Sequence, residues 1–260
     1  MDLPINGPDS WRFLYRMLWL LLLLLVGLPL TLLSGLLPGK AMKIHGRSLN
    51  EFIQCWWAVN ICRIFGLRRR VRGALLDGPL LIAANHISWL DIPLLHSMAP
   101  MGFVAKAEIA QWPLTGWLAR FGDTVFHHRG SHGSASNVVE VMTRQLEGGR
   151  KIAIFAEGGI LPGAAVKRFH ARLFGAAIDS GKPVQPVMLR YLRAGRPYHD
   201  ITFLPNERFL HNFFRLLCQP ACTAEVVILP VINPAGTQRR SLASEAQAAV
   251  AAAFGGESLR

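Results

Sequence analysis

The chain has 260 residues, of which 51% are hydrophobic and 17% are charged, and its mean hydropathy is +0.29. Globular domains carry about 25% charged residues, so this composition excludes a disordered chain and indicates that part of the exterior contacts lipid. The net charge of +12 favours an anionic partner, which leaves phospholipid headgroups, phosphorylated substrates and nucleic acid.

The most apolar part of the chain lies near its N-terminus. Residues 17–37 are 21 consecutive positions without a charge, enough for a helix of roughly 30 Å, the thickness of a bilayer core. The run is longer than the apolar region of a signal peptide, about 7–15 residues, and no small-residue cleavage site follows it. Pro29 predicts a kink, so a spanning helix and a re-entrant insertion both remain open.

Basic residues surround this apolar run. Residues 1–72 hold ten Lys or Arg and three Asp or Glu, so +7 of the net charge lies there, which favours an anionic membrane surface over nucleic acid. A second helix is predicted over residues 48–67, followed by three arginines at 68–70. It is either an interfacial helix, with Trp56 and Trp57 at headgroup depth, or a helix packed on the core of the domain.

After residue 72, short apolar runs alternate with helical patterns. This predicts an α/β fold, a mixed β-sheet flanked by helices on both faces, preceded by the N-terminal hydrophobic segment. The predicted strands cover residues 79–84, 102–105, 124–126, 151–156, 184–189, 201–204 and 224–229. The predicted helices cover residues 90–98, 113–121, 135–146, 169–180 and 241–254. We divide the chain into a membrane anchor with an interfacial helix (1–72), an α/β domain (73–235) and a C-terminal helix (236–260).

Common cofactor and nucleophile motifs are absent from the sequence. It contains no G-x-S-x-G, no glycine-rich phosphate loop and no H-E-x-x-H. The four cysteines match no metal or disulfide pattern and are expected to be structural thiols in a reducing compartment. We therefore expect neither a metal nor a bound cofactor.

Residues 85–91, Asn-His-Ile-Ser-Trp-Leu-Asp, come directly after a predicted strand, and ligands bind at strand ends in α/β sheets. His86 suits a general base, and Asp91 could hold its tautomer and stabilise the imidazolium. The alternative is structural, with Ser88 or Asp91 capping a helix and His86 bonding the backbone. The pair by itself names no reaction.

This NHxSWLD pattern resembles the first signature block of the glycerolipid acyltransferases of the 1-acylglycerol-3-phosphate acyltransferase type. Other segments are similar to the later blocks of that family, in the same order. They are residues 103–108 with 112–117, residues 125–129 (Val-Phe-His-His-Arg), residues 155–159 (Phe-Ala-Glu-Gly-Gly) and residues 184–187 (Val-Gln-Pro-Val). The resemblance covers roughly residues 70–235 and depends on the order of the blocks.

The resemblance implies direct acyl transfer without a covalent acyl-enzyme. His86 would deprotonate the hydroxyl of a lysophospholipid, which attacks the thioester of acyl-CoA or acyl-carrier protein, and Asp91 would orient His86. Lys106 and Arg129 would bind the acceptor headgroup, because arginine gives bidentate phosphate contacts and lysine a point charge. Glu157 and Gly158 would shape the same site.

The block at residues 155–159, which we call the third block, departs from the family together with the two residues that follow it. Gly159, Ile160 and Leu161 stand where the family has Thr-Arg-Ser, so its second headgroup arginine is missing and Lys167 or Arg168 would have to replace it. The catalytic block is intact, so the departure concerns the acceptor more than the chemistry.

We therefore expect a bacterial inner-membrane enzyme, with its catalytic domain on the cytoplasmic face, that converts 1-acylglycerol-3-phosphate to phosphatidic acid. Its partners would be membrane lipids and the acyl donor, and not nucleic acid. One alternative is an acyltransferase for another lyso-lipid, such as lyso-ornithine lipid. The other, from a different class, is a catalytically weak lipid-binding protein on the same fold.

Overall fold

The computed structural model describes residues 8–36, 43–44, 47–122, 124–127, 132–160 and 165–255. These form two compact units, each of which gathers distant parts of the chain. The first unit comprises Met1–Arg70, Ile87–Pro100 and Tyr191–Ala224, and the second comprises Val71–His86, Met101–Arg190 and Glu225–Arg260.

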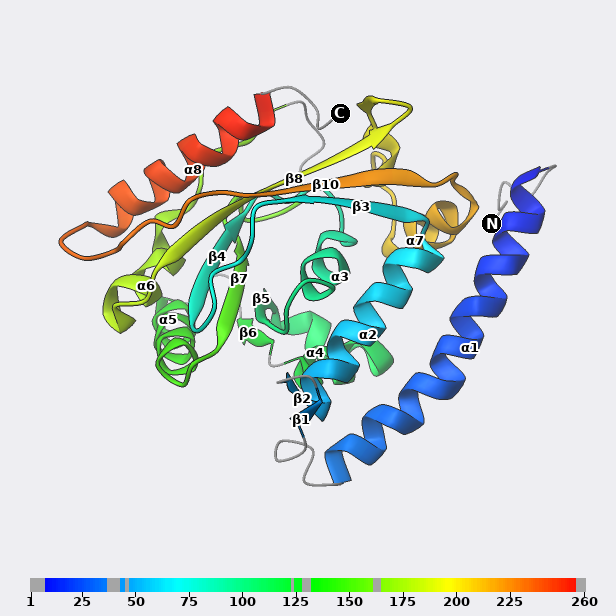
Figure 1. The fold of residues 1–260 in the computed structure, drawn as a ribbon, viewed down its shortest axis with the longest axis horizontal. Coiled ribbons are helices and arrows are strands. Elements are labelled where there is room, and N and C mark those ends of the chain that lie inside the picture. Colours follow the sequence, from blue (N-terminus) through cyan, green and yellow to red (C-terminus); the bar gives the residue numbers. More distant parts are fainter. Residues whose placement is uncertain are drawn as a thin grey trace. The chain divides into compact units, whose positions relative to one another are not determined.

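The central feature is a mixed β-sheet (Figure 1). Its strands follow the order β3 (Leu67–Arg72), β10 (Cys222–Ile228), β8 (Val184–Arg193), β4 (Leu80–Ala84), β7 (Lys151–Phe155), β5 (Gly102–Lys106) and β6 (Val125–His127), with β9 (Arg196–Pro197) antiparallel to β8. Strands β8, β4, β7, β5 and β6 are parallel, so their carboxyl ends meet at one edge of the sheet. A separate two-stranded ladder joins β1 (Lys43–Ile44) and β2 (Arg47–Ser48).

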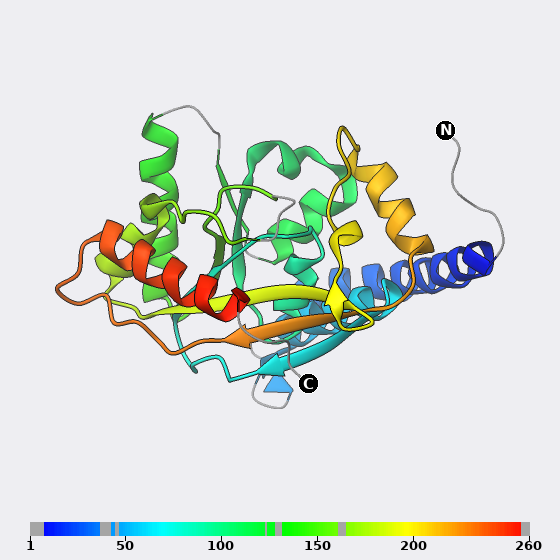
Figure 2. The same ribbon diagram turned by 90° about the horizontal axis from the view of Figure 1, so that it is seen from above.

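The second unit is built around β4, all of whose residues are buried, as is usual for a parallel strand covered on both faces. One face of the sheet packs on α5 (His132–Glu147), α6 (Gly175–Ser180) and α8 (Arg239–Gly255). Figures 1 and 2 show α8 lying along β8, and the Arg190 guanidinium donates a hydrogen bond to the Phe254 carbonyl near the end of α8. The short α4 (Pro113–Phe121) and the 3₁₀ turns η1 (Ala107–Gln111) and η2 (Ala171–Phe174) complete the unit.

The first unit contains α1 (Pro8–Leu36), α2 (Leu49–Ile64), α3 (Asp91–His96), η3 (His199–Ile201) and α7 (Phe209–Cys218). Helix α1 runs unbroken past Pro29 and packs on α2 through an inner stripe made of Leu23, Gly27, Thr31 and Ser34. The Trp57 indole donates a hydrogen bond of 2.9 Å to the Thr31 hydroxyl, and a side chain on Gly27 would overlap the Trp57 ring. Glycine at position 27 therefore lets the two helices approach closely.

Much of the remaining surface of α1 is apolar and exposed. Its large exposed side chains are Trp11, Leu14, Tyr15, Leu18, Trp19, Leu21, Leu22, Leu25, Val26, Leu30, Leu32 and Leu33. Among the described residues, α1 is the one helix long and apolar enough to cross a membrane, with a mean hydropathy of 2.4 over Ser10–Gly35. Only 28% of its most apolar window is buried, unlike a core helix.

The predicted helix at residues 48–67 is α2, and it packs into the unit. Ser48 and Glu51 form a capping box at its start, and its buried face includes Ile53, Trp57 and Cys62. Phe52 is the one large apolar side chain of α2 that is exposed, which favours the core-helix alternative. The arginines that follow lie in β3, where Arg69 bonds the Ser97 carbonyl and hydroxyl.

Two predicted elements are wrong. Residues 201–204 form no strand, because side chains satisfy their backbone groups: the Thr202 carbonyl accepts from Asn212 and Arg215, and the Leu204 amide donates to Glu207. The helix predicted over 169–180 is divided into η2 and α6. It begins late because the His170 amide donates instead to the Ala156 carbonyl.

The remaining predicted elements correspond to observed ones, and β8 extends to Arg193. A mixed sheet flanked by helices, preceded by an apolar N-terminal helix, confirms the predicted fold class. The four cysteines are buried and form no disulfide, as expected. Burial raises the pKa of the Cys62 thiol to about 12, so it is unreactive as a nucleophile.

Candidate active site

The backbone that carries His86 is fixed by its neighbour Asn85. Asn85 comes directly after β4 and is buried, and its side-chain amide exchanges two hydrogen bonds with the backbone of Leu189 in β8. The Asn85 Nδ2 donates to the Leu189 carbonyl at 2.9 Å, and the Leu189 amide donates to Asn85 Oδ1 at 2.8 Å. The side chain thus continues the ladder between the strands by one residue and holds the chain where His86 begins.

Glu157 bonds the backbone of His86 directly. Glu157 follows β7, the parallel neighbour of β4, so both residues lie at the carboxyl edge of the sheet. Its Oε2 accepts the His86 amide at 2.7 Å, and its Oε1 accepts the Lys167 amide at 2.8 Å. Glu157 is only 9% exposed, so these two charge-assisted bonds replace its contact with water. The carboxylate therefore ties the His86 backbone to the segment that carries Lys167.

The His86 ring is oriented by an aromatic stack. It lies parallel to Phe155, the last residue of β7, with ring centroids 3.8 Å apart and an angle of 11° between the planes. Phe155 in turn stacks on Phe103 of β5 at 5.7 Å. His86 remains only half-buried, so the ring has a fixed plane and stays accessible to a substrate.

Gly158 makes a sharp turn next to the imidazole of His170. Its φ of +79° is in the left-handed region that favours glycine, and a side chain on it would approach the His170 ring to 3.0 Å. His170 is exposed and is anchored by the bond from its amide to Ala156. The third block therefore brings together a buried carboxylate, a glycine turn and an exposed imidazole.

Asp91 belongs to the first unit, where it is completely buried at the start of α3. Its Oδ2 accepts the amides of Ile87 at 2.7 Å and Ser88 at 3.0 Å, the two residues that follow His86 in the chain. Its Oδ1 accepts the Tyr191 hydroxyl at 2.6 Å. Burial, together with the nearby Asp91 charge, raises the pKa of Tyr191 well above its usual value, so Tyr191 stays a donor.

The other predicted site residues have different surroundings. Lys106 is exposed at the end of β5, and Lys167 and Arg168 are exposed on the segment that the Glu157 bond holds. All three lie in the second unit with His86, Glu157 and Gly158. Arg129 lies outside the described residues. Ile160 has no positive charge. Among the residues of 155–170 that the structure describes, the Lys and Arg side chains are those of Lys167 and Arg168.

Within the described residues, no group of three His, Cys, Asp or Glu side chains could hold a metal ion. A hollow of about 770 Å³ lies between α5, α6 and the start of α8, and none of the predicted site residues lines it. A smaller one of about 120 Å³ is lined in part by Arg168 and Arg240.

Four residues that lie beside the predicted ones, in the chain or in space, were not predicted: Asn85, Phe155, His170 and Tyr191. Asn85 and Phe155 lie inside the recognised blocks, so their position was a usable signal. Tyr191 is 100 positions from Asp91, and only the parallel strand order brings it close. Nothing in the sequence marks it.

The comparisons with known proteins each find acyltransferases. A family model described as acyltransferase matches residues 64–190. The chain is 37% identical to the lyso-ornithine lipid O-acyltransferase of Pseudomonas aeruginosa over 248 residues, which cover 94% of each protein. It is 32% identical to the 1-acyl-sn-glycerol-3-phosphate acyltransferase of Neisseria gonorrhoeae over 62% of this chain and 63% of that protein.

A solved structure shares the fold. The crystal structure of the 1-acyl-sn-glycerophosphate acyltransferase of Thermotoga maritima matches with a TM-score of 0.69 and 20% sequence identity. The match covers 95% of this chain and 96% of that one.

Proposed function

Because this chain belongs to the acyltransferase family that contains the lyso-ornithine lipid and 1-acyl-sn-glycerol-3-phosphate acyltransferases, we propose that it esterifies the free hydroxyl of lyso-ornithine lipid with a fatty acyl chain. The observation that carries this choice is the likeness to the Pseudomonas aeruginosa protein, which extends over 94% of both chains. The third block supports it, since Ile160 stands where the phosphate-binding arginine of the glycerolipid enzymes is expected. An ornithine headgroup carries no phosphate and does not need that cation.

Lysophosphatidic acid is the second candidate acceptor. The likeness to the Neisseria gonorrhoeae protein favours it, although it extends over only 62% of this chain. Lys167 and Arg168 are exposed on a segment held through Glu157, so they could supply the positive charge that Ile160 lacks.

In the proposed reaction His86 acts as the general base. An imidazole nitrogen takes the proton of the acceptor hydroxyl, the oxygen forms a new bond to the thioester carbonyl carbon, and the carbon–sulfur bond breaks. The thiolate leaves and takes the proton from the imidazolium, which gives an ester and a free thiol. Glu157 and Asp91 act on the backbone on either side of the imidazole: Glu157 holds the His86 amide, and Asp91 holds the next two amides.

Acyl transfer to a panel of acceptors tests the proposal. Purified protein in mixed micelles should transfer an acyl chain from acyl-CoA or acyl-carrier protein to lyso-ornithine lipid with a higher kcat/KM than to lysophosphatidic acid. His86→Ala should lower kcat by about 10²-fold to 10⁴-fold while the protein still folds. A preference for lysophosphatidic acid would select the second acceptor. No turnover with any acceptor and donor would refute the enzymatic proposal for both.

We also propose that α1 attaches the enzyme to the inner membrane, with the catalytic residues on the cytoplasmic side, where acyl thioesters are made. The exposed apolar side chains of α1 and the excess of basic residues in 1–72 support this. Deleting residues 1–40 should release much of the protein from membranes or leave it aggregated. Protection of the catalytic domain from protease in intact spheroplasts checks its side.

A further inference from the structure

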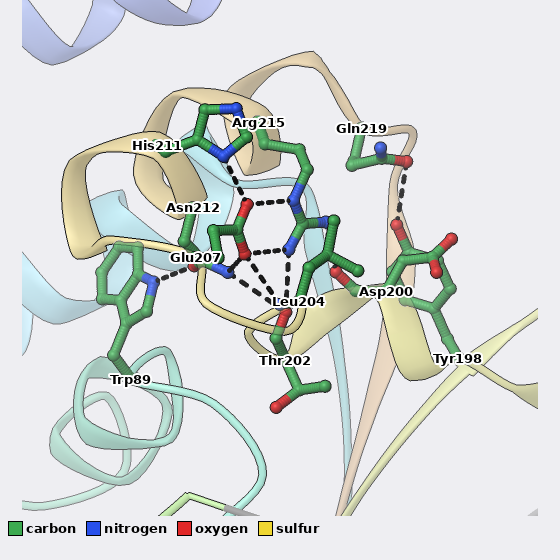
Figure 3. A network of polar contacts seen from close by, with 10 residues as sticks. All are labelled: Trp89, Tyr198, Asp200, Thr202, Leu204, Glu207, His211, Asn212, Arg215 and Gln219. Atoms are coloured by element: carbon green, nitrogen blue, oxygen red, sulfur yellow. Dashed lines mark hydrogen bonds and ion pairs between the residues drawn. The ribbon is translucent and has the colours of Figure 1, made fainter. Parts of the chain in front are cut away.

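Helix α7 holds a side chain of the first signature block from outside that block. The indole N–H of Trp89 donates to Asn212 Oδ1 at 3.0 Å (Figure 3). The same ring packs on Phe213 of α7, with centroids 5.7 Å apart and planes at 23°, and edge-on against Phe65 at 5.0 Å. Trp89 lies two positions before Asp91, so α7 holds the stretch that leads from His86 into α3.

Asn212 is itself fully buried and bonded on its other side. Its Nδ2 donates to the Thr202 carbonyl at 3.1 Å and to Glu207 Oε2 at 2.8 Å. Because both the oxygen and the NH₂ group of Asn212 are bonded, the amide cannot turn over without losing hydrogen bonds. It therefore presents its oxygen to Trp89 in one orientation.

A buried ion pair between Glu207 and Arg215 joins α7 to the segment that precedes it. The Arg215 guanidinium donates to both oxygens of Glu207, at 2.7 and 2.9 Å, and also to the carbonyls of Asp200 and Thr202 (Figure 3). Burial acts to raise the pKa of Glu207, but the hydrogen bonds from Arg215 and Asn212 outweigh it and lower the pKa to about 2. The pair therefore stays charged over the whole working pH range.

The other end of α7 is held by α1. The Arg16 guanidinium is buried and donates to the carbonyls of Leu216, Leu217 and Gln219, while Arg12 donates to the carbonyl of Cys218 at 2.7 Å. The last carbonyls of a helix lack helical N–H partners, and cations are favourable at a helix C-terminus. Of these four carbonyls, that of Leu216 also accepts the Gln219 amide at 3.3 Å. Arg12 and Arg16 of α1 thus donate hydrogen bonds to the carbonyls at the end of α7, and Asn212 in the middle of α7 bonds Trp89.

We propose that α7 is a positioning helix which joins α1 to the signature block, so that the seating of α1 sets the path of the chain after His86. Trp89, Asn212, Arg12 and Arg16 are then positioning residues for acyl transfer, a role that rests on the proposed function. Helix α1 contributes to turnover as well as to attachment, and α7 lies beyond residue 190, where the match to the family model ends.

Two conservative variants test the two ends of this connection. Trp89→Phe keeps an aromatic ring against Phe213 and removes the N–H, and Arg16→Gln keeps a polar side chain and removes the guanidinium group with its charge. Each should lower kcat by about tenfold to a hundredfold, the effect of a small misplacement of catalytic groups, and should change the acyl-donor KM by less than about threefold. Both proteins should float with vesicles as wild type does. The double variant should lose less than the product of the two single effects, because both act through α7.

Matched controls separate positioning from general destabilisation. Arg208→Gln removes an exposed charge at the opposite end of α7, and Trp56→Phe makes the same aromatic exchange in α2, outside the signature blocks. Both should keep kcat within about twofold of wild type. Activities are measured well below each Tm and per mole of folded protein. If Arg16→Gln does not fold, Arg12→Gln, which removes the bond to the Cys218 carbonyl, takes its place.

The outcomes are distinct. A lower Tm with unchanged kcat in Trp89→Phe would mean that α7 only stabilises the fold, and it would overturn the proposal. A loss of kcat in Trp89→Phe, with normal kcat in the arginine variants or independent effects in the double variant, would overturn the connection to α1. A wild-type protein that transfers no acyl chain would refute the proposed function instead.

Discussion

Replacing Glu157 by Gln tests how the His86 backbone is held. The carboxylate accepts two amides, from His86 at 2.7 Å and from Lys167 at 2.8 Å, with one oxygen each. Glutamine has one carbonyl oxygen, so its NH₂ group would face the other N–H. The variant loses one bond to a charged group, worth about 1.5–3 kcal/mol, which corresponds to roughly tenfold to a hundredfold in rate if the imidazole loses its position.

The assay is steady-state acyl transfer with both substrates varied. If Glu157 acts through the His86 backbone, kcat falls and the acceptor KM changes little; if it shapes the headgroup site, the acceptor KM rises and kcat is kept. The control is Glu140→Gln on α5, whose 3.6 Å contact with Arg144 is exposed and should change kcat by less than about twofold. Wild-type kcat, KM and Tm in Glu157→Gln would refute the reasoning.

Three further predictions concern residues of the first unit. Tyr191→Phe removes the 2.6 Å bond to buried Asp91, so kcat should fall about tenfold and Tm should drop; equal values for both proteins would show that the hydroxyl is dispensable. Gly27→Ala places a methyl group against the Trp57 ring and should lower the Tm measured in detergent, whereas an unchanged Tm would show that the ring can move aside. Burial lowers the pKa of His96 to about 4, below its ordinary 6.5, so the stability that neutral His96 contributes is complete above pH 6.5. It should then fall by up to about 3 kcal/mol as the pH drops towards 4, and denaturant titrations should show no such slope in His96→Gln.

The parallel strands could be predicted because their signals are local. Strands β4 and β7 are short, apolar runs that end at recognisable blocks, and their predicted bounds differ by one residue from the observed ones. The placement of His86 and Glu157 at neighbouring strand ends follows from the same pattern. For these residues, the end of the apolar run in the sequence predicts the end of the strand in the sheet.

Helix α7 was not predicted, although apolar residues recur along it at helical spacing; what could not be predicted is the burial of two of its polar residues. Asn212 and Arg215 are buried, whereas Leu210 is 60% exposed, which inverts the usual relation between polarity and burial on a helix. The partners that make this inversion stable, Glu207 and Trp89, are set by the folded chain and not by spacing. The burial of a polar network cannot be inferred from the spacing of the apolar residues.

The two-sided character of α1 determines how a water-soluble form of this enzyme can be made. Truncation would remove Arg12 and Arg16 together with the apolar surface, and with them the bonds at the end of α7. Polar substitutions at outward positions such as Leu18, Leu25 and Leu32 would change only the face turned away from α2 and leave the inner stripe against Trp57. Redesign of one helix face, rather than deletion, is the route to a soluble protein that keeps its internal geometry.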